Sequence, residues 1–237
     1  GVMSRAGHTE AGCDLARLAG FEPAAVIVEI MNADGSMARR PDLEAFAQTH
    51  NLKIGTIADL IHYRSVKEKT VECINRRQVD TEYGPFELRT YRDLARGDLH
   101  FVMLKGHVDP AEPTLVRVHV MDVAKDLIGL KRPGDAGKHS WNYRDALKTI
   151  SEAGQGVLVL ICHDESTAQV EESIDWMLSG KQPVRSPDQV YKQVGTGSQI
   201  LRDLGVRKMR LMSAPMRFTA LSGFDLEIVE HLEPGSQ

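Results

Sequence analysis

The chain has 237 residues, of which 42% are hydrophobic and 26% charged, and its formal net charge is -4. A chain of this length and ordinary composition can bury a sizeable core in one large or two modest domains, which argues against a disordered protein. The slightly acidic balance provides no broad basic field, so neither nucleic acid nor an anionic membrane surface is an expected partner.

Three cysteines, at positions 13, 73 and 162, lie far apart and form no Cys-x-x-Cys pair. This spacing suggests neither a disulfide framework nor a cysteine zinc site, and unpaired thiols suit the cytoplasm. No apolar run approaches the roughly 20 residues of a membrane span. No basic and then apolar leader opens the chain. We therefore expect a cytoplasmic protein.

The first 64 residues alternate predicted helices with apolar segments. Thr9 is a candidate N-cap of a helix through about Gly20, with Leu15 and Leu18 on its apolar side. Residues 24–31 form a continuous apolar run of strand length, the pattern of a strand covered on both faces. The remaining predictions are a turn over 32–35, a helix over 42–50, a short strand over 53–56 and a helix over 57–64.

A charged, irregular stretch from 64 to about 77 is the candidate domain boundary, and the rhythm beyond it changes to paired strands. Strands are predicted over 86–91, 100–105, 114–121, 156–162, 208–212 and 225–230. Helices are predicted over 141–153 and 165–179, and a third over 199–205 after a turn at 195–197. Loops are expected over 125–140 and 181–187. Because helices alternate with apolar strands, we predict an α/β (α+β) fold in which helices layer the sheets.

Residues 5–9, Arg-Ala-Gly-His-Thr, place useful chemical groups just before a predicted helix. A helix N-terminus presents free N–H groups and a positive end, which favour an anion such as phosphate. Arg5 can grip phosphate oxygens in pairs, Thr9 adds a hydroxyl, and Gly7 lets the backbone approach a ligand. His8 can ligate a metal or move a proton. Alternatively, Thr9 only caps the helix, Arg5 lies in solvent and His8 is structural.

Glu29 interrupts the apolar run 24–31, where a carboxylate is costly unless it is paired or bound to something. A buried carboxylate of this kind suits proton transfer at neutral pH. The alternative is an ion pair between Glu29 and a buried arginine. The residues alone therefore indicate a candidate phosphate and metal site.

Long motifs in residues 1–64 resemble those of the 3,4-dihydroxy-2-butanone 4-phosphate synthases. The first is Gly1-Val2-Met3-Ser4-Arg5-Ala6-Gly7-His8-Thr9-Glu10-Ala11, and the others cover 14–20, 28–32, 34–39 and 57–61. These motifs are long, ordered and correctly spaced. They cover the segment almost without gaps, so the resemblance is specific.

The resemblance implies conversion of ribulose 5-phosphate to 3,4-dihydroxy-2-butanone 4-phosphate and formate, with Mg2+ as cofactor. By this resemblance, Arg5 and Thr9 hold the substrate phosphate. His8 is similar to the magnesium-ligating histidine, and Glu29 to the acid/base of enediol formation and skeletal rearrangement. His8 and Glu29 are thus the expected catalytic residues. The expected substrate-binding residues are Arg5, Ala6, Gly7, His8, Thr9 and Glu29.

The same resemblance implies that part of the synthase domain is missing. The family carries an acidic metal-binding loop and further substrate contacts in an N-terminal half that this sequence lacks. One histidine cannot hold magnesium, which prefers oxygen ligands. We therefore expect residues 1–66 to be the C-terminal part of a truncated domain that is inactive by itself. The complete protein is expected to be a homodimer.

Residues from about Val79 resemble GTP cyclohydrolase II, an enzyme often fused behind the synthase. The similarity lies in framework segments at 84–86, 115–119, 154–159, 195–206, 211–215 and 223–229. The resemblance implies a second α/β domain over 79–237, joined to the first by a linker over 67–78.

The residues that carry the chemistry of that family are not retained. The family binds zinc through three cysteines, whereas this chain has Asp122 near the first position and no cysteine in 131–139. Asp122 with His119 or His139 has too few suitable ligands, so no zinc is expected. The segment His163-Asp164-Glu165 lies where the family has a basic GTP loop, and we expect it to be a solvated loop.

The catalytic aspartate and arginine that the family places before Gly195 are replaced by about Val190 and Lys192. Lysine does not reproduce the bidentate guanidinium of arginine. The leading hypothesis is therefore a synthase of riboflavin biosynthesis with a degenerate, non-catalytic cyclohydrolase-like domain. The alternatives are a regulatory or assembly module of the flavin pathway and, less favoured, an active GTP cyclohydrolase II.

Overall fold

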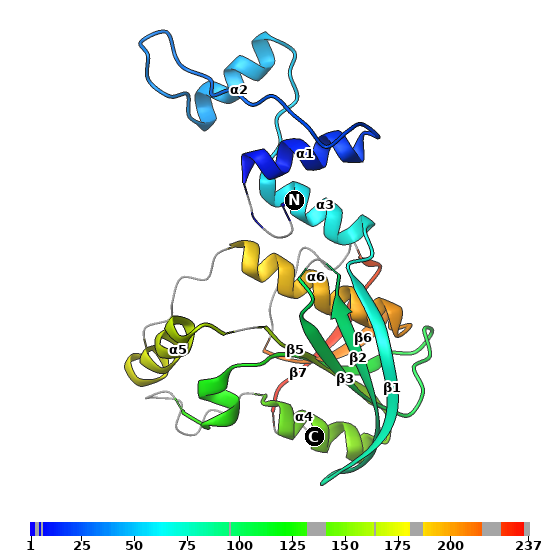
Figure 1. Ribbon diagram of the computed structural model, residues 1–237. Coiled ribbons are helices and arrows are strands. Elements are labelled where there is room, and N and C mark those ends of the chain that lie inside the picture. Colours follow the sequence, from blue (N-terminus) through cyan, green and yellow to red (C-terminus); the bar gives the residue numbers. More distant parts are fainter. Residues whose placement is uncertain are drawn as a thin grey trace. The chain divides into compact units, whose positions relative to one another are not determined.

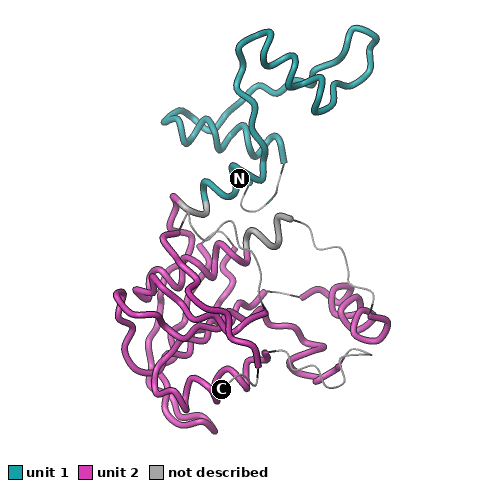
Figure 2. The backbone as a smooth tube through the Cα atoms, turned by 180° about the vertical axis from the view of Figure 1, so that it is seen from behind, with its two compact units in different colours: residues 1–64 teal, residues 65–237 magenta. Residues whose placement is uncertain are grey.

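The computed structural model describes residues 1–2, 5, 7–94, 96–131, 141–163, 165–180, 187–214 and 224–234. Side chains at 65–66 and 187–192 are also outside the description. The chain divides into two compact units, residues 1–64 and 65–237 (Figure 2). Each has its own buried cluster of side chains, so they are described one at a time.

The regular elements described in unit 1 are helices, in contrast to the alternation of helices and strands predicted for it. Its helices are α1 (His8–Leu18), α2 (Arg40–Thr49) and the larger part of α3 (Ile57–Lys67), which continues past the unit boundary. The helix predicted over 57–64 is therefore confirmed and longer than expected. The strand predicted over 53–56 is absent from the described backbone.

Helix α1 begins earlier than predicted, at His8. Gly7 is its N-cap, in an extended conformation and without a side-chain capping bond, so the prediction that Thr9 caps the helix was wrong. Leu15 and Leu18 are 56% and 41% exposed, so the expected apolar side is not buried within this unit. Close packing instead involves Gly12, where an added Cβ would lie 2.8 Å from the Cβ of Ala25.

The apolar run 24–31 does not form the predicted buried strand. Val26 and Val28 are 94% and 82% exposed, and the run pairs only at its end, through an isolated antiparallel bridge between Met31 and Met37. A strand needs a neighbour for its backbone hydrogen bonds. The described part of unit 1 provides no such neighbour along most of the run.

The turn and helix after this run agree with the predictions. Gly35 N–H donates to the carbonyl of Asn32 at 2.9 Å, which closes the predicted turn. Asp34 caps the same turn by accepting from the N–H and hydroxyl of Ser36, and these bonds lower the pKa of Asp34. Helix α2 starts at Arg40, with Asp42 accepting the N–H of Arg39 at 2.9 Å.

Unit 2 contains one mixed seven-stranded sheet, which confirms the predicted α/β class. The strand order is β1-β2-β3-β5-β4-β6-β7, with antiparallel pairing from β1 to β5 and parallel pairing from β5 to β7. The strands are β1 (Val71–Thr81), β2 (Gly84–Asp93), β3 (Leu99–Lys105), β4 (Thr114–Val120), β5 (Gly156–Ile161), β6 (Lys208–Met212) and β7 (Glu227–Leu232). The other elements are a π-helix η1 (Val123–Leu127), α4 (Tyr143–Ala153), α5 (Thr167–Ser179) and α6 (Pro187–Asp203).

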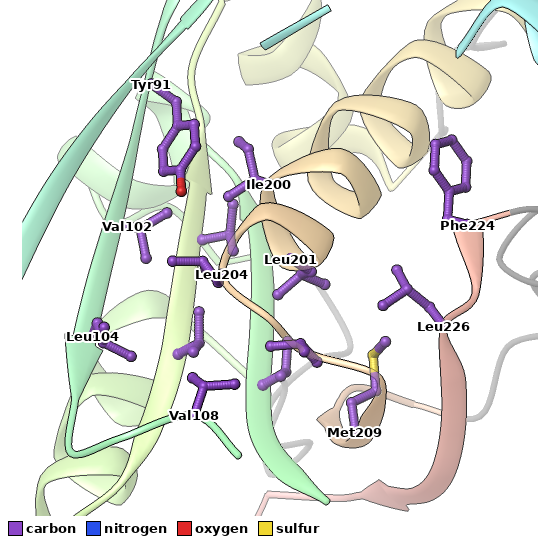
Figure 3. Packing of buried hydrophobic residues seen from close by; sticks show 14 of the residues in the cluster. Tyr91, Val102, Leu104, Val108, Ile200, Leu201, Leu204, Met209, Phe224 and Leu226 are labelled. Atoms are coloured by element: carbon purple, nitrogen blue, oxygen red, sulfur yellow. The ribbon is translucent and has the colours of Figure 1, made fainter. Parts of the chain in front are cut away.

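Helices α4 and α6 cover opposite faces of this sheet (Figure 1). On one face, Ile200 and Leu201 of α6, with Leu204 just after the helix, pack against strand residues that include Tyr91 and Val102 (Figure 3). On the other face, Leu147 and Ile150 of α4 pack against a second apolar cluster. The continuous apolar sequence of β5 follows from its position between these two layers.

Three predictions in unit 2 need correction. Residues 195–197 do not form a turn, because α6 runs through them as one helix from Pro187 to Asp203. The expected linker over 67–78 instead contains most of β1, which starts at Val71. The predicted loop over 125–140 overlaps η1, and its residues 132–140 lie outside the described part of the chain.

Candidate functional site

The candidate phosphate-binding turn lies at the N-terminus of α1. His8 and Thr9 are both exposed there, and Ala11 N–H is the first to bond within the helix, to the carbonyl of Gly7 at 2.9 Å. The preceding N–H groups of the first turn therefore lack intrahelical acceptors and can bind an anion. Ala6, which was predicted to contribute backbone contacts, lies outside the described residues.

Arg5 is close to this turn and weakly held. Its Nη1 is 3.2 Å from Oε1 of Glu10, and the arginine side chain is 82% exposed. An ion pair this exposed contributes about 0–1 kcal/mol, because solvent screens it. A phosphate group can therefore replace Glu10 as the partner of Arg5 at little cost.

Glu29 is exposed, and among the described residues it makes no hydrogen bond or ion pair. The expectation that it is buried was therefore wrong for this chain, and so was the alternative of a buried arginine partner. No contact in the described part of unit 1 brings its carboxylate to Arg5, His8 or Thr9. The run that carries Glu29 does pass α1, because Ala25 and Ile27 lie against Gly12.

A buried carboxylate that the sequence did not reveal fixes the start of the turn. Asp14 of α1 is 4% exposed and accepts the N–H of Val2 at 2.7 Å. It also accepts from Nη1 of Arg64 at 2.7 Å and from Nη2 of Arg17 at 3.2 Å. The only hint in the sequence is the Asp14–Arg17 spacing of one helical turn, which is common at the surface.

The described residues of unit 1 do not fit a magnesium site. No group of three or more His, Cys, Asp or Glu side chains that could hold a metal occurs among the residues described anywhere in the chain. His8 offers one nitrogen, whereas magnesium requires a near-octahedral set that is mostly oxygen. His8 can thus supply at most one ligand of a site completed elsewhere.

In unit 2, the residues considered as a substitute zinc site are engaged in other contacts. His119 and Asp126 are 2% and 3% exposed in their side chains, and Nε2 of His119 lies 2.8 Å from Oδ2 of Asp126. Asp122 caps η1 by accepting the N–H of Lys125 at 2.9 Å, and its other oxygen accepts the hydroxyl of Ser173 at 2.7 Å. His139 lies outside the described residues.

His119, Asp126 and the neighbouring Arg117 form a buried polar network, in which burial and charge shift the pKa values. Burial raises the pKa of Asp126, but hydrogen bonds from His119 and from the N–H of Asp122 outweigh it, so the net pKa is lowered. Arg117 lies beside His119 and donates to the carbonyls of Met212 at 2.7 Å and Trp141 at 3.1 Å. Burial lowers the pKa of Arg117 to about 10. The network therefore binds β4, β6 and the start of the α4 region together.

The segment after β5 is not the free loop that was expected. Glu165 has a side chain only 12% exposed, lies 3.7 Å from Nε2 of His163, and accepts the N–H of Val123 at 3.2 Å. The N–H of Cys162 lies 3.2 Å from Nδ1 of the buried His100, and burial raises the pKa of the Cys162 thiol. Asp164 lies outside the described residues, as do the side chains of Val190 and Lys192.

Two family models match the chain. The model for 3,4-dihydroxy-2-butanone 4-phosphate synthase matches residues 1–63, and the model for GTP cyclohydrolase II matches residues 72–233. The first match lies at the N-terminal end of the chain, and the second spans more than half of it. No helix among the described residues is both long and apolar enough to span a bilayer.

Curated relatives support the same assignment. The chain is 56% identical over 236 residues to 3,4-dihydroxy-2-butanone 4-phosphate synthase of Pseudomonas aeruginosa, covering 98% of this chain and 62% of that protein. It is 42% identical over 244 residues to riboflavin biosynthesis protein RibBA of Aquifex aeolicus, covering 98% of this chain and 59% of that protein. The chain thus spans about three fifths of the length of these relatives.

A solved structure is also similar to this chain. The crystal structure of RibBX, a two domain 3,4-dihydroxy-2-butanone 4-phosphate synthase from A. baumannii, superposes with a TM-score of 0.74 at 46% identity. The match covers 98% of this chain and 61% of that one. The first 63 residues match the model of 3,4-dihydroxy-2-butanone 4-phosphate synthase, and through residues 72–233 the chain belongs to the GTP cyclohydrolase II family.

Proposed function

We propose that the full-length protein containing this chain acts in riboflavin biosynthesis and converts ribulose 5-phosphate to 3,4-dihydroxy-2-butanone 4-phosphate and formate. The names of relatives up to 56% identical support this proposal. Residues 1–64 then form the C-terminal part of the synthase domain. The complete protein would be a cytoplasmic homodimer.

The bare apolar run 24–31 is the observation that carries the proposal. Val26 and Val28 are almost fully exposed, although such a run is typical of a strand covered on both faces. Chain that the relatives possess beyond the matched region would pair with this run and cover it. Glu29 would then become a buried carboxylate beside the substrate, as the resemblance requires.

The phosphate of the substrate would be held at the start of α1. Arg5 would exchange its exposed partner Glu10 for two phosphate oxygens, while Thr9 donates its hydroxyl. The free N–H groups of the first helical turn would add to this grip. Glu29 would then take up and return protons at the sugar carbons during enediol formation and rearrangement.

We propose that only the complete synthase domain binds magnesium. When bound, such an ion stabilises negative charge on the oxygens of an enediolate. His8 would supply one ligand, and the remaining oxygen ligands would come from the part of the domain beyond this chain. The described residues do not form that site by themselves.

The cyclohydrolase-like unit is proposed to be non-catalytic and to bind no zinc. In support, Asp122 uses both carboxylate oxygens in capping η1 and contacting Ser173, and His119 is paired with Asp126. A role in assembly or regulation of the synthase would remain for this unit. Zinc at one equivalent per chain, together with formate release from GTP, would instead establish an active GTP cyclohydrolase II.

The synthase proposal can be tested in the full-length protein by following 3,4-dihydroxy-2-butanone 4-phosphate formation from ribulose 5-phosphate. His8→Ala and Glu29→Ala should each lower the rate by about a hundredfold or more, because both would act on protons or charge at the reacting carbons. His50→Ala and Glu44→Ala change the same residue types at exposed positions of unit 1 and should leave the rate nearly unchanged. Near-normal rates of the first two variants would remove those residues from the mechanism.

A further inference from the structure

The start of the phosphate-binding turn is anchored at two points. Val2 is fully buried against Leu60 and Ile61 of α3, and its N–H donates to Asp14 of α1 at 2.7 Å. The carbonyl of Gly1 in turn accepts the N–H of Arg5 at 3.2 Å. A single carboxylate thus fixes the backbone from which the Arg5 side chain extends.

The carboxylate of Asp14 is itself held rigidly. Its side chain is 5% exposed and contacts two guanidinium groups, Arg64 at 2.7 Å and Arg17 at 3.2 Å. The Arg64 side chain is 8% exposed, so this pair is buried and its geometry is demanding. Arg64 also ties Asp14 to α3, which packs against the other side of Val2.

The backbone passes very close to this carboxylate. A Cβ added at Gly1 would lie 2.2 Å from Oδ1 of Asp14, so a side chain at this position would displace the carboxylate. Glycine at position 1 therefore allows the backbone to approach Asp14 without displacing its carboxylate. Such close contact leaves little freedom in where the turn, and with it Arg5, begins.

We infer that Asp14 is a positioning residue for the substrate phosphate, acting through the buried Asp14–Arg64 pair and the N–H of Val2 on the turn that carries Arg5. This inference rests on the proposed synthase function. Asp14 does not touch the substrate. It holds the backbone that positions Arg5 and the first turn of α1 next to the phosphate. Preorganised contacts of this kind determine the geometry of binding.

The test uses Asp14→Asn in the full-length protein, because asparagine keeps the shape of the side chain but removes the negative charge that pairs with Arg64 and Arg17. The KM for ribulose 5-phosphate should rise about tenfold while kcat changes by less than about threefold. The inhibition constant of inorganic phosphate should rise in parallel. A merely structural role would lower the active fraction, and thus kcat, while KM and phosphate inhibition stay constant.

Glu44→Gln is the matched control, because it removes a carboxylate from an exposed pair with Arg40 in the same unit. Its KM and phosphate inhibition should equal those of the parent protein. If Asp14→Asn does not fold, Arg64→Lys tests the same Asp14–Arg64 pair. Lysine keeps the charge but not the guanidinium contact, so the KM for ribulose 5-phosphate should again rise. An unchanged KM in whichever variant folds overturns the inference, whereas a parent protein that forms no product overturns the synthase proposal instead.

Discussion

At the scale of single residues, two buried acid–base pairs among the described side chains lie in different surroundings. Asp14 and Arg64 join two helices of unit 1, whereas His119 and Asp126 lie between β4 and η1 in unit 2. Both aspartates also accept backbone N–H groups, which spreads the charge of each carboxylate over several donors. Removing either carboxylate would therefore break several bonds at once.

For the pair in unit 2, Asp126→Asn should lower the free energy of unfolding at neutral pH by about 1.5–3 kcal/mol, as expected for buried hydrogen bonds to a charged group. The pKa of Asp126 is lowered in the folded protein, so its contribution is present above the ordinary carboxyl pKa and is lost as pH falls through the lowered value. The difference from the parent protein should thus be complete at neutral pH and shrink below about pH 3.9.

Chemical denaturation of both proteins at several pH values measures this difference. Glu152→Gln is a suitable control, because its carboxylate forms an exposed 3.9 Å pair with Lys148. That variant should be as stable as the parent at every pH. A difference for Asp126→Asn that is independent of pH would argue against an ionised Asp126 in the folded state.

Among the helices and strands, some were predicted from the sequence and others were missed. Strand β5 was predicted well, because helices cover both faces of the sheet there and its sequence is continuously apolar. β1 was missed, since it lies at the sheet edge and carries many charges. The run 24–31 was predicted as a strand, but among the described residues it is exposed and pairs only through the Met31–Met37 bridge.

Some residues of the candidate site were also predicted from the sequence, and others were not. The motif around residues 5–9 was found directly, because the chemical groups are contiguous at a helix start. Asp14 and its bond to Arg64 were not found, because the two residues lie 50 positions apart and a single sequence does not report such proximity. The exposure of Glu29 was also unpredictable, since burial depends on neighbours rather than on the run itself.

At the junction of α4 and β5, two glycines should respond differently to alanine. Gly156 has φ of 151°, and an added Cβ would lie 2.9 Å from the carbonyl oxygen of Leu115 and 3.0 Å from Ile150. Gly154 has φ of 73°, with nothing within 4 Å of the same position. Gly154→Ala should therefore cost about 1–2 kcal/mol, from backbone strain alone.

Gly156→Ala should cost about 1–3 kcal/mol more than Gly154→Ala, because overpacking adds to the strain. Denaturant unfolding of the two variants side by side measures the difference. Equal losses would mean that β4 and α4 can move aside for a methyl group.

At the scale of the whole molecule, the two units differ in how much core they contain. Unit 1 has a small buried cluster around Val2, Leu60 and Ile61, whereas both faces of the sheet in unit 2 are packed with apolar side chains. Hydrophobic burial is the main source of folding free energy, so unit 2 should be the stable part of this chain.

A fragment of residues 68–237, which starts just after α3, should therefore fold alone. Its thermal unfolding should be cooperative, with a midpoint within about 5 °C of the main transition of the 237-residue chain, because its clusters are internal to unit 2. Circular dichroism during heating is the measurement. An unfolded or non-cooperative fragment would show that unit 2 depends on unit 1.

The edge strand β1 affects how two copies of this protein could associate through their sheets. It is eleven residues long and pairs on one side only among the described strands, so its outer row of N–H and C=O groups resembles a template for another strand. Glu72, Arg76 and Arg77 are exposed along it, and bringing two such charged margins together is unfavourable. Self-association is therefore not expected to extend the sheet past β1, which also protects this margin against fibrous aggregation.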